Sequence, residues 1–186
     1  MKVEKTPSCS RDVDGSALIV NDTAFIGFEN GLFEVFNPND DYASKNKNFY
    51  EPEIYNELKL YSSLDISRRG CNIITESSPA LLGRKIFIAA GSGYIYGYNI
   101  DKGEIDWEFF IGSDLNGSCV VTEDGCLLVP IEKQFIAGKG GMLKLNPRKE
   151  PKDAVEWYFP VNNLHLLDWD GGVIGSACIN DKYKSS

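Results

Sequence analysis

The chain has 186 residues, of which 27 are acidic and 19 are basic, so its formal net charge at pH 7 is −8. Apolar residues make up 42% and aromatic residues 12%, which is typical of a folded globular domain and excludes a disordered or low-complexity chain. The basic residues form no run. We therefore expect no nucleic-acid partner, because phosphate recognition depends on clustered Lys and Arg.

The chain shows no segment that predicts membrane insertion or export. Its longest apolar runs, such as Ile86 to Ala90, have the length of a strand and not of a bilayer span, so we expect no transmembrane segment. The first twenty residues carry several charges and no continuous apolar core, so no signal peptide is visible.

The cysteine spacing indicates neither a zinc site nor a disulfide framework. The five cysteines lie far apart and include no C-x-x-C pair. They are Cys9, Cys71, Cys119, Cys126 and Cys178. We expect them to be free thiols that pack as small apolar side chains.

A short pattern around a serine occurs four times and divides the chain into similar units. The four serines are Ser16, Ser78, Ser118 and Ser176. In the first two units a turn glycine follows 15 residues later, and in three units an asparagine closes the next strand six residues after that glycine. These residues are Gly31, Gly93 and Gly140, followed by Asn37, Asn99 and Asn146. Such agreement in spacing indicates a structural repeat.

Each unit is predicted to be a small antiparallel meander of four strands. The turns between strands carry Asn-Gly, Ser-Gly or Asp-Gly, which supply the positive φ that tight hairpins need. A fourth strand follows each closing asparagine, and Trp107 and Trp157 fall on it in the second and third units. Four short strands repeated at intervals of 40 to 62 residues predict an all-β fold, the β-propeller.

The strand faces support this prediction. Residues 23–28 and 86–90 are apolar at successive positions, as expected for strands sandwiched between neighbouring sheets. The two tryptophans occupy matching positions, and we expect them to pack between blades with each indole N–H bonded to a carbonyl.

The segment from Tyr98 to Trp107 resembles the repeat of pyrroloquinoline-quinone (PQQ)-type propellers, whose blades carry an Ala-x-Asp-x-x-Thr-Gly-x-x-x-Trp stretch. Gly103 and Trp107 match this stretch, Asn99 stands in place of the Asp, and Lys102 replaces the Thr. The resemblance covers residues 14–180 and is strongest in the second unit. It implies a bacterial PQQ-like propeller protein with a periplasmic or extracellular location.

The domain prediction is a single partial propeller over residues 1–186, similar in architecture to quinoprotein and WD40 propellers. The units span about 14–66, 72–113 and 114–165, and a next blade starts at 172–186. Since closed propellers have about four to eight blades, we expect the missing blades, or another protein chain, to complete the ring.

Two segments exceed the repeat and are candidate binding regions. The insertion 38–64 begins polar, and its second half fits either a short helix or a strand. It is interpreted as an edge strand reached by a loop, with a partner-binding loop as the alternative. The insertion 132–139 is predicted to be a surface excursion.

No catalytic or metal-binding set is predicted. His165 is the only histidine and lies between units, so we expect a packing or surface role. The Asp-x-Asp-Gly stretches at 12–15 and 168–171 lack the glutamate that completes an EF-hand loop, and are interpreted as turns, with calcium as the minor alternative. The recurrence of the serines at equivalent positions favours a structural role over a nucleophilic one.

The resemblance leaves two function classes open. Quinoprotein dehydrogenases of this type have an adjacent Cys-Cys pair and a Glu/Asn/Asp calcium set, and no two cysteines here are adjacent. We therefore expect neither PQQ nor calcium in this segment. The preferred hypothesis is a non-catalytic scaffold that binds a protein or other ligand through rim loops, like the outer-membrane assembly lipoprotein of this family. The alternatives are a segment of a PQQ-dependent dehydrogenase whose active site lies outside this chain and a secreted carbohydrate-binding or hydrolase-associated propeller.

Overall fold

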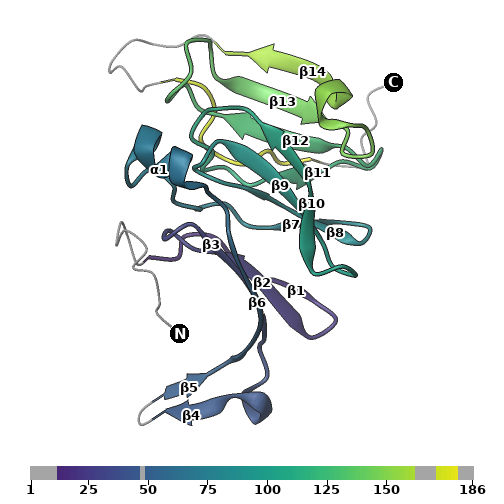
Figure 1. Ribbon diagram of the computed structural model, residues 1–186. Coiled ribbons are helices and arrows are strands. Elements are labelled where there is room, and N and C mark those ends of the chain that lie inside the picture. Colours follow the sequence, from purple (N-terminus) through teal and green to yellow (C-terminus); the bar gives the residue numbers. More distant parts are fainter. Residues whose placement is uncertain (1–11, 47–48, 162–170, 180–186) are drawn as a thin grey trace.

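The computed structural model describes residues 12–46, 49–161 and 171–179. Three four-stranded antiparallel sheets follow one another along the chain and stack face to face (Figure 1). They are unit 1, unit 2 and unit 3 below. The prediction of an all-β propeller segment built from four-stranded units is confirmed.

The strands of each sheet follow in sequence order from the inner to the outer edge. Unit 1 contains β1 (Leu18–Val20), β2 (Thr23–Gly27), β3 (Leu32–Asn37) and β6 (Glu53–Lys59). Unit 2 contains β7 (Ala80–Leu82), β8 (Lys85–Ala89), β9 (Tyr94–Asn99) and β10 (Glu104–Phe110). Unit 3 contains β11 (Val120–Val121), β12 (Leu127–Ile131), β13 (Gly141–Leu145) and β14 (Val155–Pro160).

The insertion between β3 and β6 forms a short hairpin. It contains the 3₁₀ turn η1 (Asp40–Tyr42) and the paired strands β4 (Ser44–Asn46) and β5 (Phe49–Glu51). The segment whose sequence fitted either a helix or a strand is β6, which pairs antiparallel with β3 over its whole length. Pairing with the open edge of β3 decides the conformation, because it satisfies the main-chain groups of that edge.

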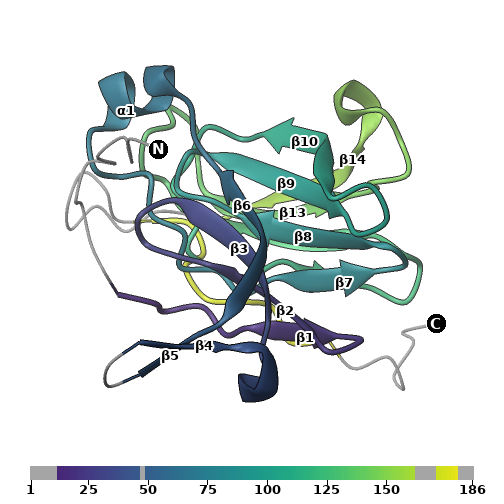
Figure 2. The ribbon, with the colours of Figure 1, turned by 60° about the horizontal axis from the view of Figure 1, so that its bottom comes forward.

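One α-helix, α1 (Ser63–Arg69), occurs in the described part of the chain and was not predicted from the sequence. Ser62 caps it, and the Asp65 carboxylate accepts a hydrogen bond from the Ser62 amide at 2.7 Å, so the two residues form a capping box. The helix lies at the end of unit 1 opposite the β4–β5 hairpin (Figure 2). Its last residue, Arg69, donates to the carbonyls of Gly91 and Gly112 in unit 2. A second 3₁₀ turn, η2 (Pro151–Asp153), precedes β14.

The apolar core lies between the sheets. Phe25 and Phe33 of unit 1 pack on one face of unit 2 beside Tyr98, with ring centroids 6.0 and 5.5 Å from that tyrosine. Phe87 and Trp107 lie on the other face of unit 2, against Leu127 and other side chains of unit 3. Both faces of unit 2 are therefore buried, as its uninterrupted apolar strands predict.

A row of serine hydrogen bonds ties the inner edges of the units together. The Ser16 amide donates to Oγ of Ser78 at 2.9 Å, and the Ser78 amide donates to Oγ of Ser118 at 2.8 Å. The Ser118 amide donates in turn to Oγ of Ser176 at 2.9 Å. Each serine in the middle of this serine ladder is thus both donor and acceptor, which fixes the register of one sheet on the next.

The start of the next unit follows the same pattern. The Thr75 amide donates to the Phe28 carbonyl at 3.2 Å, and the Val173 amide donates to the Ile131 carbonyl at 2.9 Å. Both donors lie three residues before a ladder serine. Residues 171–179 therefore lie against unit 3 as residues 74–78 lie against unit 1.

In units 1 and 2, a side chain on the outer strand bonds to the turn of the following unit. Trp107 is 7% exposed, and its Nε1 donates to the Lys149 carbonyl of unit 3 at 3.2 Å. The register places Asn56 at the matching position of unit 1, where its Nδ2 donates to the Gly103 carbonyl at 2.7 Å. Trp157, expected between blades like Trp107, is 43% exposed instead, because no described residue covers that face of β14.

The serine ladder predicts a specific loss of stability. Ser78→Ala leaves the Ser16 amide without its acceptor, and we expect a loss of about 0.5–1.5 kcal/mol in the free energy of unfolding. Ser118→Ala should cost a similar amount, and Ser63→Ala, at an exposed helix position, should change stability by less than about 0.5 kcal/mol. Urea unfolding followed by circular dichroism measures all three. Equal stabilities for the three variants would refute a stabilising ladder.

The exposed face of β14 predicts association of the 186-residue chain. Trp157 is 43% exposed and Phe159 64% exposed, and apolar side chains gathered on one face bind hydrophobic dyes or other copies. We expect 1-anilinonaphthalene-8-sulfonate fluorescence, which Phe159→Ser combined with Trp157→Gln should reduce. A monodisperse compact monomer that binds no dye would contradict this expectation.

Candidate functional site

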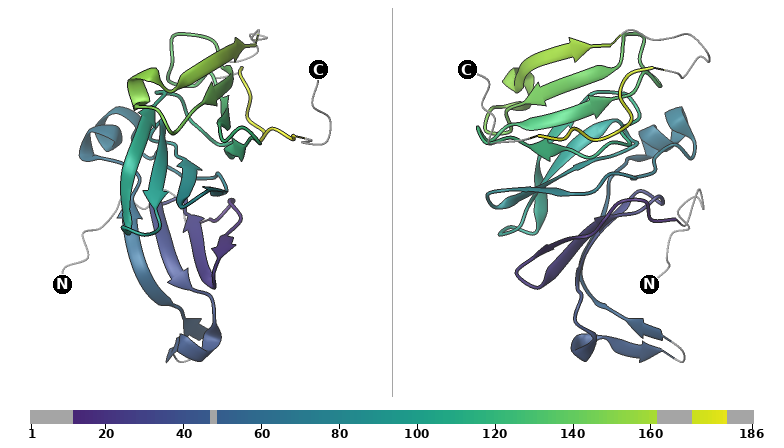
Figure 3. Two further views of the ribbon diagram at one scale, coloured as in Figure 1. Left: turned by 90° about the vertical axis from the view of Figure 1, so that its right-hand side faces the viewer. Right: turned by 180° about the vertical axis from the view of Figure 1, so that it is seen from behind.

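The β4–β5 hairpin and the turns beside it form a rim region that projects from unit 1. In two views the hairpin extends away from the three stacked sheets (Figures 1 and 3). Asn39 caps η1 by accepting a hydrogen bond from the Asp41 amide at 3.0 Å. Tyr42, which ends η1, is 65% exposed, and Tyr50 on β5 is 57% exposed. We call residues 38–55 the rim hairpin.

A pocket of about 570 Å³ opens between the rim hairpin and the β1–β2 turn. It is lined by Asn21, Asp22, Thr23, Asn37, Pro38, Asn39, Tyr42, Glu53 and Tyr55. Asn21 and Asp22 have φ values of 48° and 59°, the left-handed conformation of a two-residue hairpin turn, which these residue types tolerate. The lining offers two phenol rings, amides and carboxylates. It contains no Cys, His or Lys that could act as a nucleophile or a base.

The closing asparagines organise the turns that lead to the outer strands. Oδ1 of Asn37 accepts from the Asn39 amide at 3.0 Å, and Oδ1 of Asn99 accepts from the Asp101 amide at 3.0 Å. Oδ1 of Asn146 accepts from the Arg148 amide at 3.2 Å. The same side chain thus closes an Asx-turn in all three units, which gives the repeated asparagine a physical role.

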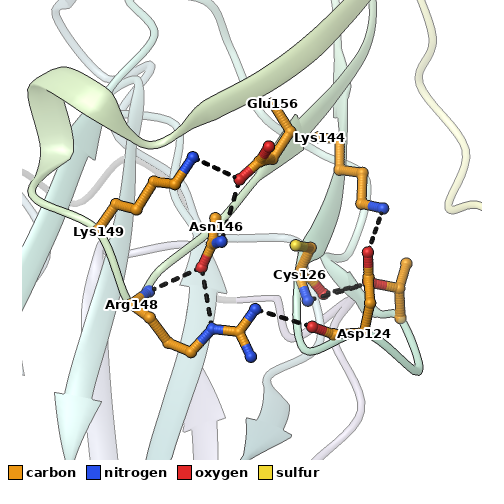
Figure 4. A network of polar contacts seen from close by, with 8 residues as sticks. Asp124, Cys126, Lys144, Asn146, Arg148, Lys149 and Glu156 are labelled. Atoms are coloured by element: carbon orange, nitrogen blue, oxygen red, sulfur yellow. Dashed lines mark hydrogen bonds and ion pairs between the residues drawn. The ribbon is translucent and has the colours of Figure 1, made fainter.

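The turn of unit 3 carries a surface network around Asn146 (Figure 4). Nδ2 of Asn146 donates to Glu156 at 3.0 Å, and Lys149 pairs with the same carboxylate at 2.8 Å. Lys144 pairs with Asp124 at 2.6 Å, and this bond is the main cause that lowers the pKa of Asp124 to about 2. The network holds neighbouring turns of unit 3 together. Because Asp124 is exposed, the network lies on the protein surface.

A second pocket of about 580 Å³ lies at the outer edge between units 2 and 3, where Lys85, Asp106 and residues 147–151 line it beside Trp107. Burial alone would raise the pKa of Asp106, but hydrogen bonds from Lys85, Asn99 and Lys102 together lower it to about 2. The carboxylate is therefore ionised and paired, which is a structural arrangement and not that of a general base.

Glycine is required at the turn positions for different physical reasons in different units. Gly31 and Gly93 have φ values of 76° and 88°, which L side chains rarely adopt. Gly140 has no positive φ. A Cβ there would lie 2.4 Å from the Ile131 carbonyl oxygen, so close packing requires the glycine. Gly103, which matches the family repeat, has a φ of 70° in the turn before β10.

The cysteine prediction needs a correction. Cys119 and Cys126 are free and buried, as expected, and burial raises the pKa of the Cys119 thiol to about 12. Cys178 is free and exposed. Cys71, however, is disulfide-bonded and not a free thiol. Spacing could not show this, because cysteines that are distant in sequence meet only in the folded chain.

Several predictions fall on positions outside the described ranges. These are Cys9, His165 and the Asp-x-Asp-Gly stretch that begins at residue 168. The other such stretch, residues 12–15, was predicted to be a turn, but it precedes β1 as irregular backbone with a bend at Gly15, and its Asp14 carboxylate lies near those of Glu29 and Glu76.

Two buried acids of unit 3 were not predicted from the sequence. Asp114 is 2% exposed and Glu132 is 4% exposed. The insertion 132–139 therefore begins with a buried acid, whereas a surface excursion was expected throughout. Phe135 in this insertion is exposed, and the guanidinium of Arg69 lies 4.8 Å from its ring centroid. These contacts join α1 to unit 3 and had no signal in sequence spacing.

Comparison with known proteins supports the fold and leaves the activity open. No family model and no curated protein matches the chain. Among solved structures, BamB from Moraxella catarrhalis matches with a TM-score of 0.51 and 14% identity, over 81% of this chain and 38% of that one. A europium-containing methanol dehydrogenase matches with a TM-score of 0.58 and 14% identity, over 81% of this chain and 25% of that one.

The chain thus spans well under half the length of either protein, and the likeness concerns fold alone. In the described part of the chain, no helix is long and apolar enough to cross a membrane. The stacked four-stranded units and these two neighbours identify the fold as a segment of a β-propeller.

Proposed function

We propose that this chain is a non-catalytic scaffold, part of a PQQ-like β-propeller, that binds a protein partner through the rim hairpin of unit 1. The observation that carries the proposal is the hairpin itself. It interrupts the repeat between the third and fourth strands, projects from the sheets, and exposes Tyr42, Tyr50 and Tyr55 by 52% or more. Tyrosines on a projecting loop suit protein recognition, because a large ring is ordered at small entropic cost.

The charge around the rim pocket indicates the chemistry of the partner. Asp22 and Glu53 line the pocket, and the whole chain has a net charge of −8. A segment with Lys or Arg beside an apolar side chain would pair with these carboxylates and pack on the tyrosine rings. We expect such a partner to bind more weakly as ionic strength rises, since partly exposed charges are screened by salt.

The disulfide of Cys71 bears on the cellular location of the protein. Cys71 is disulfide-bonded, and disulfides persist mainly outside the reducing cytosol. We propose a periplasmic or extracellular location on this ground together with the resemblance of the repeat. Labelling of Cys71 by a membrane-impermeant maleimide before and after reduction, in intact cells, tests this location.

The binding proposal is tested by site-specific crosslinking in the native host. A benzoylphenylalanine at position 42 should crosslink to one dominant protein, which is then purified and titrated calorimetrically. Tyr42→Ala and Tyr55→Ala should each weaken that binding at least tenfold, because the rings supply apolar contact at the pocket. Phe110→Ala, a similarly exposed aromatic in unit 2, is the matched control and should leave affinity unchanged.

Two outcomes would refute the proposal. One is an affinity that Tyr42→Ala and Tyr55→Ala leave within twofold of the unsubstituted chain. The other is crosslinking that is equally strong from position 110, since binding would then not depend on the rim hairpin.

A further inference from the structure

Two exposed aromatic side chains belong to one surface patch at the α1 end of the stack, opposite the β4–β5 hairpin (Figure 2). Phe110 ends β10 and is 52% exposed, and Phe135 lies in the insertion 132–139 and is 49% exposed. A Cβ on Gly112 would lie 3.4 Å from the Phe110 ring and 3.7 Å from Ile136, so these two segments are adjacent. Tyr94 packs against Phe110 with ring centroids 4.6 Å apart. We call Arg69, Tyr94, Phe110, Phe135 and Ile136 the helix-side patch.

The charge in this patch is held in a fixed position. Nη1 of Arg69 donates to the Gly91 carbonyl at 2.9 Å, and Nη2 donates to the Gly112 carbonyl at 2.5 Å. The same guanidinium lies 4.8 Å from the centroid of the Phe135 ring. A partner would therefore not have to order this arginine on binding, which removes a usual entropic cost of association.

The backbone of Phe135 is strained. Its φ is 65°, in the left-handed region that a bulky side chain rarely adopts because Cβ crowds the following carbonyl oxygen. Among the described residues, the other non-glycine positions with positive φ are Asn21 and Asp22, whose residue types tolerate it. A ring that is half exposed to water recovers little of this cost through burial. Strain that presents an apolar ring to solvent indicates a role for the ring in binding.

The charges beside the rings indicate the chemistry of a partner. In α1 and in the insertion 132–139, the charged residues that reach solvent are all basic: Arg68, Arg69, Lys133 and Lys139. The two acidic residues of these segments are buried. Glu108, two positions before Phe110, is an exposed acid on the neighbouring strand. The surface around Phe135 is therefore locally basic, although the chain as a whole has a net charge of −8.

We propose that the helix-side patch binds a second protein partner through an acidic segment that carries an aromatic or large aliphatic side chain. The carboxylates of this segment pair with Arg68 and Lys133, and its apolar side chain packs on the rings of Phe110 and Phe135. Aromatic side chains and arginine are the residue types that contribute most to protein interfaces.

The proposal goes beyond the rim hairpin and does not rest on it. The two surfaces share no residue and lie at opposite ends of the sheets (Figure 2). The pocket at the rim hairpin is lined by the acids Asp22 and Glu53, whereas the helix-side patch is flanked by basic residues. The chain would thus hold two partners of opposite charge apart on one stack of sheets.

The partner chemistry is tested by site-specific crosslinking in the native host from benzoylphenylalanine at position 135. Mass spectrometry then identifies the crosslinked segment. We expect a segment with at least two Asp or Glu beside an aromatic or large aliphatic residue, in a protein other than the one captured from position 42. A segment without acids, a crosslink to lipid, capture of the same protein from both positions, or no crosslink at all would refute the proposal.

The affinity test uses a synthetic peptide of the captured segment, titrated against the 186-residue chain by fluorescence anisotropy. Phe135→Gly and Phe110→Ala should each weaken binding at least tenfold. Arg68→Ala should weaken it about threefold and make it less dependent on salt, because a screened charge pair is lost. The same peptide with its acids changed to amides should bind at least tenfold more weakly. Phe110→Ala thus has opposite outcomes at the two surfaces, since it leaves the partner of the rim hairpin bound.

Control variants and a stability measurement separate binding from a purely structural role. Ile19→Ala, at an exposed apolar position on β1, and Arg84→Ala, at an exposed arginine of unit 2, should leave peptide affinity within twofold. Phe135→Gly should not lower the melting temperature, because glycine adopts the positive φ without strain. A clear fall in melting temperature for Phe135→Gly, or equal affinities for Phe135→Gly and Ile19→Ala, would contradict a docking role for the ring.

Discussion

The hydrogen bond from one repeat serine to the next is the constraint on which the arrangement of the sheets depends. Apolar packing between sheets is non-directional and would tolerate sliding of one unit against another. The bond from the Ser16 amide to Ser78, repeated from Ser78 to Ser118 and from Ser118 to Ser176, is directional and sets one register at each interface. A single position in the repeat thereby converts stacked sheets into a defined propeller segment.

The ladder also determines which side chains meet near the inner strands. The residue two before each serine is Asp14, Glu76 and Asn116 in the three units. Because the serines are held side by side, these oxygen-bearing side chains are brought to one end of neighbouring inner strands. Glu29, which follows the second strand of unit 1, reaches the carboxylates of Asp14 and Glu76. A structural contact thus brings acidic side chains of two units together.

The fold was predictable from the sequence because its signals are local and periodic. The group of acidic residues was not predictable, because its members are distant in sequence. Strands, turn glycines and closing asparagines recur in the same order, with the asparagine six residues after the glycine in each of three units, and each acts within one unit. The meeting of Asp14 with Glu29 and Glu76 depends on sheet stacking, which no spacing records. The short helix α1 had a weak signal in Ser62 and Asp65, a capping box that the strand-like repeat around it obscured. The disulfide of Cys71 had none.

The outer edges show how a repeat can diverge without losing its interface. At the position where unit 2 has Trp107, unit 1 has Asn56, yet both donate a side-chain N–H to a carbonyl in the next turn. The interface therefore retains a side-chain N–H donor at this position. In unit 2 the aromatic ring of Trp107 also adds buried apolar area. This explains why the family repeat is recognisable in unit 2 and faint in unit 1: the hairpin inserted before β6 separates Asn37 from Asn56, while the hydrogen bond that joins the sheets persists. An insertion at this point can project from the rim without disturbing the stack, which is the freedom that a scaffold needs to acquire a binding loop.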